Sequence, residues 1–331
     1  MLRKNVISGT GVDRQNQQIS LPALIEYADQ LNNSDSVPRM GLNHDRSLLP
    51  VGKVISGELI SRDGEVLLEA TIDDFMDEFE YCVGPNGEHL YKGKSSIDSR
   101  PFAEEPALSK SQFLVKLNPI HYSNDDFADV ADYLWNQCSA QVDTTIEKGL
   151  ESVIQFVFIF AAGYLTNALL PKVNEKAAEK LSDAISDDIA SGYESLKKAI
   201  VYVTKKITSV GKKTYVFVEP EQPVEFVVRA RTADEVMNAF SKLSEFDYVS
   251  VVEQFKHYTN DNLKKIQLLY NSADGKWEMT YITTNDGQVI GTEKNYKRAV
   301  IMYKKIMESL TAGFSISGSA TLSDLEGDND V

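Results

Sequence analysis

The chain has 331 residues, of which 42% are hydrophobic, so it can bury a sizeable core and is not a disordered chain. Its formal net charge of -15 argues against a nucleic-acid partner, because contacts to a phosphate backbone are built from clustered lysine and arginine. The length favours more than one domain. We therefore expect a globular protein that does not bind nucleic acid.

The distribution of apolar residues predicts an α+β protein in four parts. They are a β-rich domain over residues 1–130, a helical region over 131–210, a small α+β domain over 211–315 and a disordered acidic tail over 316–331. The first residues are basic but lack an apolar segment behind them, so no signal peptide is predicted. The two cysteines lack metal-ligand spacing, which indicates reduced residues of a cytoplasmic protein.

The N-terminal part alternates strand-like runs with turns. A strand is predicted at residues 6–11 and a helix at 21–31, where apolar residues recur with helical spacing. The runs at 53–60 and 65–72 flank an Asp-Gly pair, which is the strongest short signal for a hairpin. With a further strand at 113–117, the pattern predicts a closed or nearly closed β-barrel with flanking helices in the first 125 residues.

The segment VPRMGLNHDRSLLPVGKV, residues 37–54, contains the first candidate for chemistry. It places His44 between two apolar runs, and a histidine there can titrate near neutrality. The alternative is an ordinary half-buried histidine that is hydrogen-bonded by Asp45 or by a backbone carbonyl.

Residues 72–82, IDDFMDEFEYC, carry five carboxylates. Their spacing lacks the pattern of a cation-binding loop, so a solvated helix face is the favoured interpretation over a metal site. No cofactor or metal ligand set is predicted anywhere in the chain.

Two further segments supply groups that nucleophilic catalysis needs. GKSSIDSRPF, residues 93–102, contains Ser95 and Ser96, and LVKLNPIHYSND, residues 114–125, contains His121. A serine acts as a nucleophile only when a base removes its proton and donors hold the oxyanion. The order of segments resembles that of the prohead proteases, which mature the capsids of tailed phages and share their fold with the herpesvirus assembly protease. The corresponding stretches are ISGTGVD, LNHDRSLLPVGKV, LISRDGEVLLEATI and GKSSIDSRPF.

The resemblance covers residues 5–125 and implies a serine endopeptidase that cleaves protein substrates in an assembly, inside an infected or bacterial cell or on a virion. It implies Ser96 as the nucleophile and His44 as the general base. The third member is His121, where the herpesvirus branch has its second histidine, or a carboxylate, which the phage branch more often has there. Asp98 replaces the family's glycine, and its charge opposes oxyanion formation unless Arg100 offsets it. The alternative is a non-enzymatic structural or membrane-associated effector protein that uses a protease-like fold for assembly or recognition.

The central region begins with a predicted helix at 127–150 and continues with an uncharged run at 152–170. This run is close to the roughly 20 residues that span a bilayer, so it predicts one very apolar helix in contact with a membrane, in a bundle or in an oligomer interface. The run at 175–207 predicts an amphipathic helix that packs against it. A homo-oligomer is expected because an apolar helix of this kind can form an interface between copies of the chain.

The C-terminal part has the pattern of a compact module. Strands are predicted at 213–220, 223–231, 264–271, 277–284 and 288–294. A helix capped by Thr232 and Glu235 follows the second strand, and a last helix is predicted at 296–310. We interpret His257 as a structural histidine, because the sequence offers it no catalytic neighbour.

Overall fold

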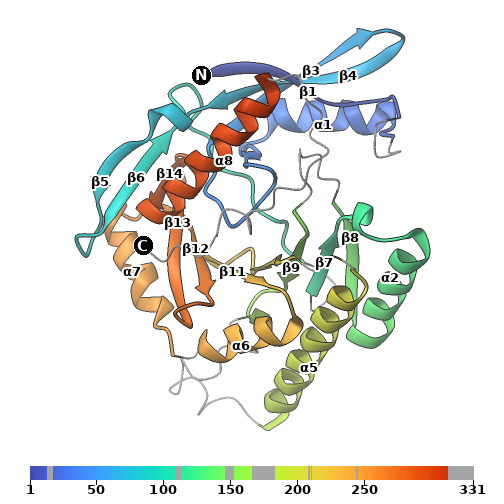
Figure 1. Cartoon of the computed structure of the whole chain (residues 1–331), viewed down its shortest axis with the longest axis vertical. Coiled ribbons are helices and arrows are strands. Elements are labelled where there is room, and N and C mark those ends of the chain that lie inside the picture. Colours follow the sequence, from blue (N-terminus) through green and yellow to red (C-terminus); the bar gives the residue numbers. More distant parts are fainter. Residues whose placement is uncertain are drawn as a thin grey trace.

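The structure is a computed structural model that describes residues 1–12, 18–108, 113–145, 153–165, 183–207, 209, 211–243 and 245–311. Two sheets organise these residues (Figure 1). The smaller sheet is antiparallel, with the order β1-β4-β3-β2. Its strands are β1 (Leu2–Gly9), β2 (Arg39–Met40), β3 (Gly52–Arg62) and β4 (Glu65–Asp74).

The larger sheet has ten strands in the order β5-β6-β14-β13-β12-β11-β10-β9-β7-β8. They are β5 (Glu80–Val83), β6 (His89–Lys94), β7 (Phe113–Leu117), β8 (Ala140–Thr144), β9 (Gln155–Phe160), β10 (Lys213–Val218), β11 (Val224–Ala230), β12 (Leu263–Asn271), β13 (Lys276–Thr284) and β14 (Gln288–Thr292). The pairs β7/β8, β9/β10 and β11/β12 are parallel and the others are antiparallel. Strands from all three expected domains therefore join in one sheet.

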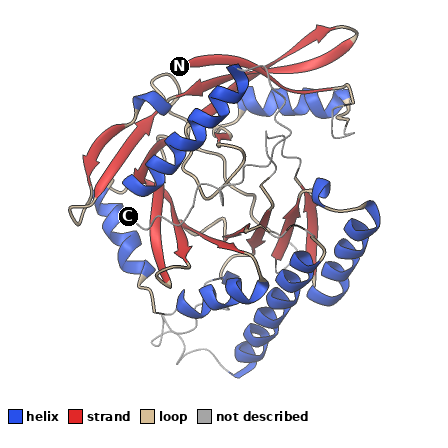
Figure 2. Ribbon diagram, in the orientation of Figure 1, coloured by secondary structure: helices blue, strands red, loops and turns tan. Residues whose placement is uncertain are grey.

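Helices cover both faces of the larger sheet. The helices in the described residues are α1 (Leu21–Asn33), α2 (Asn124–Cys138), α5 (Asp183–Lys205), α6 (Ala233–Leu243), α7 (Tyr248–Tyr258) and α8 (Glu293–Thr311), with 3-10 turns η1 (Met76–Glu78) and η2 (Pro119–His121). Helix α1 packs on the smaller sheet, against β3 and β4. Figure 2 shows α2, α5 and α6 on one side of the sheet and α8 on the other. The mixed α+β class is confirmed.

Four hydrophobic cores are found among the described residues, and the two largest are relevant here. The larger core packs the sheet against α2, α5, α6 and α7. A second core joins α8 to the loop before β3, and its members include Leu48, Leu49 and Met302. The loop at residues 41–51 therefore lies between the sheet and α8, which places His44 and its neighbours over the centre of the molecule.

The strongest local signals of the sequence are confirmed. Asp63 and Gly64 both have positive φ, as a two-residue hairpin turn requires, and they join β3 to β4 with Arg62 opposite Glu65. Helix α1 begins after Ser20, whose hydroxyl accepts a hydrogen bond from the N–H of Ala23. The helices α5, α6 and α8 and the five C-terminal strands also occupy their predicted places.

The very apolar helix predicted at 152–170 is wrong. Residues 155–160 form the strand β9, whose six residues are all buried between β10 and β7. Phe156, Phe158 and Phe160 enter the larger core, whereas Val157 and Ile159 pack on the opposite face. A strand that is buried on both faces has no polar positions, so its sequence carries no alternation. Among the described residues, no helix combines the length and apolar character needed to cross a bilayer.

Other predicted elements also differ. Neither sheet closes on itself in the described residues, because β1, β2, β5 and β8 are edges, so the barrel is not confirmed. The predicted helix at 127–150 ends at Cys138 with Ser139 in the left-handed region, and β8 follows. Helix α7 was not predicted. The tail 316–331 lies outside the described residues.

The acidic run at 72–82 is not a solvated helix face. Asp73 and Asp74 end β4 and are buried. Asp74 pairs with Arg3 at 3.0 Å and accepts a hydrogen bond from Tyr303 of α8 at 2.6 Å. Asp74 therefore connects the smaller sheet to the last helix, whereas Asp73 accepts a hydrogen bond from Ser95, which follows β6.

Candidate functional site

The segment from Ser95 to Arg100, called the serine segment below, follows β6 directly. Ser95 is buried, and its hydroxyl donates to Asp73 at 2.5 Å while it accepts the N–H of Asp98 at 2.8 Å and that of Ile97 at 3.3 Å. Ser96 is exposed at a bend. The structure therefore uses Ser95 to shape the turn and leaves Ser96, the candidate nucleophile, at the surface.

Arg100 holds the serine segment in place. Its guanidinium binds the Asp98 carboxylate with a shortest distance of 2.6 Å, which confirms that Arg100 offsets the charge of Asp98. The same guanidinium donates to the carbonyls of Leu31, Ser34 and Ile55 in α1 and β3. Burial disfavours the charged form of Asp98, but the bonds to Arg100 outweigh it and lower the pKa of the carboxyl.

A buried lysine of β3 also forms hydrogen bonds to the serine segment. Lys53 donates to the carbonyls of Asp98 at 2.7 Å and Arg100 at 2.6 Å. Burial lowers the pKa of Lys53, and the nearby carboxylates of Asp98 and Asp286 partly oppose that shift. Gly287, in the turn between β13 and β14, has φ of 72°, and a Cβ there would clash with Lys53 Nζ. The serine segment thus connects the smaller sheet to one end of the larger one.

His44 lies in a different environment. It is exposed, has φ of 58°, and lines a pocket of about 180 Å³ together with Arg46, Lys116 and Gln155. Gln155 begins β9 and accepts a hydrogen bond from the N–H of Arg46 at 3.1 Å. The loop that carries His44 is therefore seated over β7 and β9.

A buried ion network forms the floor beside this pocket. Arg46 pairs with Glu225 at 2.5 Å and with Glu105 at 2.6 Å, and Lys116 pairs with Glu105 at 2.8 Å. Gln267 donates to Glu225 at 2.7 Å and to the Arg46 carbonyl at 2.6 Å. Strands β11, β12 and β7 thus position a loop more than 60 residues earlier than any of them in sequence.

The network sets the charge states of its members. Burial alone would raise the pKa of Glu105, but Arg46 and Lys116 outweigh it and lower that pKa to about 2. Burial likewise opposes ionisation of Glu225, and Arg46 and Arg39 nevertheless lower its pKa. Arg46 is buried too, and the two glutamates raise its pKa. All three side chains are therefore charged at neutral pH.

His121 ends the 3-10 turn η2, after β7. Burial lowers its pKa, and a hydrogen bond with the backbone of Val153 partly opposes this shift. Its Nε2 is buried and lacks a hydrogen-bond partner among the described residues. Contacts of the serine segment run to Asp73 and Lys53, while the His44 pocket faces β7 and β9, so the set of Ser96, His44 and His121 stays a prediction.

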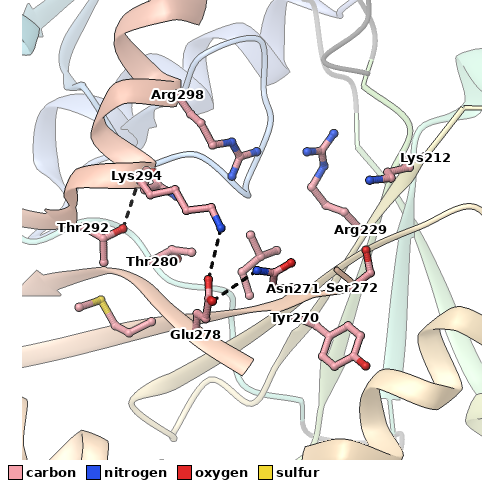
Figure 3. A pocket seen from close by; sticks show the side chains of 13 residues that line it. Lys212, Arg229, Tyr270, Asn271, Ser272, Glu278, Thr280, Thr292, Lys294 and Arg298 are labelled. Atoms are coloured by element: carbon pink, nitrogen blue, oxygen red, sulfur yellow. Dashed lines mark hydrogen bonds and ion pairs between the residues drawn. The ribbon is translucent and has the colours of Figure 1, made fainter. Parts of the chain in front are cut away.

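A second pocket, of about 120 Å³, lies on the same side of the sheet as α8 (Figure 3). Its charged lining consists of Lys212, Arg229, Glu278, Lys294 and Arg298. Lys294 pairs with Glu278 at 3.6 Å, and Arg298 donates to the Ser47 hydroxyl at 3.4 Å. We call this site the basic pocket.

Sequence reasoning missed both groups of residues. Their members come from loops and strands that are far apart along the chain, so no spacing identifies them. The available signals were single polar residues in apolar strands, namely Glu225 in VEFVV and Gln267 in KKIQLLY. A charge at such a position must find a buried partner.

Comparison with known proteins returned no family model, no curated protein and no solved structure that matches this chain.

Proposed function

We propose that the chain is a non-enzymatic recognition or assembly protein in which the protease-like segments have a structural role. The observation that carries the proposal is the hydrogen bonding of the backbone after Ser96. The N–H groups of Ile97 and Asp98 donate to the Ser95 hydroxyl, and that of Arg100 donates to Asp98. Donors beside a nucleophile would have to face a developing oxyanion, and these face inward to their own segment.

The contacts around the serine segment support the same conclusion. Lys53 of β3 donates to two carbonyls of the segment, and Arg100 donates from the segment to carbonyls of α1 and β3. A carboxylate, Asp98, occupies the position where the resembled family has a glycine. Such a segment keeps two sheets in register, which is a structural task. Its expected partners are proteins of an assembly, including further copies of the chain.

A second candidate is the serine endopeptidase that the resemblance implies. One observation favours it: Ser96 and His44 are both exposed, and His44 lies on the wall of a pocket. A loop movement would have to bring the Ser96 hydroxyl to the His44 ring, since catalysis requires a hydrogen bond between them.

Labelling with a fluorophosphonate probe separates the two candidates. For the non-enzymatic protein we expect equal, background labelling of the wild type, Ser96→Ala and His44→Ala. Labelling of the wild type that disappears in both variants would overturn the proposal and establish the endopeptidase. Light scattering after size exclusion tests the assembly role, and a monomer at all accessible concentrations would contradict the expected homo-oligomer.

A further inference from the structure

We propose that the outer edge of β8 pairs with the same strand of a second copy of this chain. β8 is the last strand of the larger sheet, and in the described part of the chain it pairs with β7 alone. Backbone groups on the outer side of such a strand are a template for a further strand. The inference rests on the assembly role proposed above, and it names the partner and the contact.

The backbone of β8 directs alternate residues toward its outer side. The N–H of Thr145 donates to the carbonyl of Leu117 in β7 at 2.9 Å, so this residue faces β7. Backbone groups of successive residues point to opposite sides of a strand, and Ala140, Val142 and Thr144 therefore present theirs outward. An antiparallel pair of β8 strands centred on Val142 uses all three residues and forms about six hydrogen bonds, against about four for an axis at a neighbouring residue.

The side chains of β8 favour the same centre. A twofold axis at Val142 sets Gln141 of one copy opposite Asp143 of the other, on one face of the sheet and twice by symmetry. Gln141 is half-buried and Asp143 is exposed, and the glutamine amide can donate to the carboxylate. An axis at Asp143 would instead place two carboxylates directly opposite one another, which is destabilising.

Helix α2 lies over β8 at the margin of the sheet. It contacts β8 and α5, and α5 lies between α2 and α6 (Figure 1). Leu134 of α2 enters the larger core, and Tyr133 stacks on Tyr202 of α5 with ring centroids 3.7 Å apart. Successive helical residues are about 100° apart, so Trp135 lies about 160° around the helix from Tyr133. Trp135 therefore points away from α5, on the side of the outer edge of β8.

Trp135 gives this side of α2 the character of an interface. It is 63% exposed, although tryptophan is a highly buried residue on average and is enriched in protein interfaces. Val142 lies about 7 Å along β8 from its start, and the same distance back along α2 from its end reaches about residue 133. An axis at this level sets Trp135 of each copy against the small Ala131 of the other.

Sedimentation velocity of the whole chain over a range of concentrations tests the interface. We expect the wild type to form a dimer. Trp135→Ala should raise the dimer dissociation constant at least about tenfold, because buried tryptophans are typical hot spots. Tyr81→Ala is the matched control: it removes an exposed aromatic residue from β5, the other edge of the larger sheet, and should change the constant less than about twofold.

A charge swap on β8 tests the register with side chains that are accessible to water. Gln141→Glu sets two pairs of like charge across the axis and should raise the dissociation constant about three- to tenfold. Adding Asp143→Lys turns both repulsions into attractions and should restore the dimer. Circular dichroism checks that each variant is folded.

The outcomes separate this interface from the proposed function. An oligomer that is equally strong in Trp135→Ala and Gln141→Glu, or a loss in Gln141→Glu that Asp143→Lys does not reverse, would overturn the interface and leave the assembly role intact. A wild-type monomer would overturn both. A β8-dependent dimer that reacts with the fluorophosphonate probe at Ser96 would overturn the non-enzymatic function alone.

Discussion

The buried ions beside His44 show how single residues fix the loop over the sheet. Arg46 and Glu225 are almost fully removed from water, and such a transfer costs several kcal/mol for each ion unless partners compensate. The cost of burying the Glu225 carboxylate is offset by hydrogen bonds that it accepts from Arg46 and Gln267. Removing one partner leaves the other charge buried and unpaired, so the loss of either side chain should destabilise the fold.

Glu105 should make the stability of the protein depend on pH. Its pKa is lowered from 4.5 to about 2, so its ionised form stabilises the fold above pH 4.5, and this contribution is lost as the pH falls toward 2. We expect Glu105→Gln to lower the free energy of unfolding by about 3 kcal/mol at pH 7 and by much less near pH 2. Urea unfolding at several pH values measures this difference. A pH-independent loss, or an equal loss in the exposed Glu221→Gln variant, would contradict it.

Substitution of Ser95 should affect the protein more than substitution of Ser96. A catalytic Ser96 would give the opposite order for activity. Ser95→Ala leaves the buried Asp73 and the Asp98 N–H without their partner and should cost about 1–3 kcal/mol of unfolding free energy. Ser96→Ala changes an exposed side chain and should stay within about 0.5 kcal/mol. Thermal or urea unfolding of both variants provides the comparison, and a larger loss for Ser96→Ala would refute the assignment of Ser95 as the structural serine.

Among the secondary-structure elements, β9 differs most from what the sequence predicts. The absence of charge from the whole run at 152–170 predicts an apolar helix, whereas the residues of β9 form a strand. Periodicity cannot separate a doubly buried strand from a buried helix, and the discriminating signal was the aromatic and β-branched content of QFVFIF. Local signals succeeded where turns or caps dictate them, as in the Asp63-Gly64 hairpin.

The interior position of β9, between β10 and β7 in the larger sheet, predicts a large effect of side-chain truncation. Phe158 is fully buried and stacks on Phe217 of β10, with ring centroids 5.1 Å apart. Phe158→Ala should therefore destabilise the protein by about 3–5 kcal/mol, through lost burial and the cavity left behind. Val249→Ala, in an exposed position on α7, is the matched control. Equal unfolding free energies for the two variants would be incompatible with a buried, interior β9.

The residues that form the candidate sites could not be predicted from the sequence, and the reason differs from that for β9. The sequence offers His44 as a candidate for chemistry because turn residues and apolar runs flank it, and the structure places this residue on the wall of a pocket. Arg46, Glu105 and Glu225 meet only through tertiary packing, and the basic pocket takes its arginines from β11 and α8. Sequence spacing carries information over a few residues, whereas these contacts depend on the strand order of the sheet.

For the whole molecule, Asn295 of α8 links the first and last parts of the chain. It is buried, donates to the Ser47 carbonyl at 2.9 Å and accepts the N–H of Leu49 at 2.9 Å. Since Arg298 also binds Ser47, one loop touches both α8 and, through Arg46, the ion network. Loop, helix and sheet should consequently unfold together.

We expect a single unfolding transition in urea, with coincident curves for far-UV circular dichroism and for tryptophan fluorescence. Asn295→Ala removes two buried hydrogen bonds and should lower the free energy of unfolding by about 2–4 kcal/mol, moving both curves equally. Two separate transitions in the wild type, or a shift of only one curve in the variant, would show that the N-terminal loop folds independently of α8.

The pairing of β6 with β14 affects how the chain folds during its synthesis. On the ribosome, the β5–β6 hairpin emerges early, but the strand beside it, β14, spans residues 288–292 and is among the last to be synthesised. Until then β6 exposes an unpaired edge, which is a site for aggregation in a nascent chain. Translation of the long interval between these strands is therefore the period in which the polypeptide most needs a chaperone.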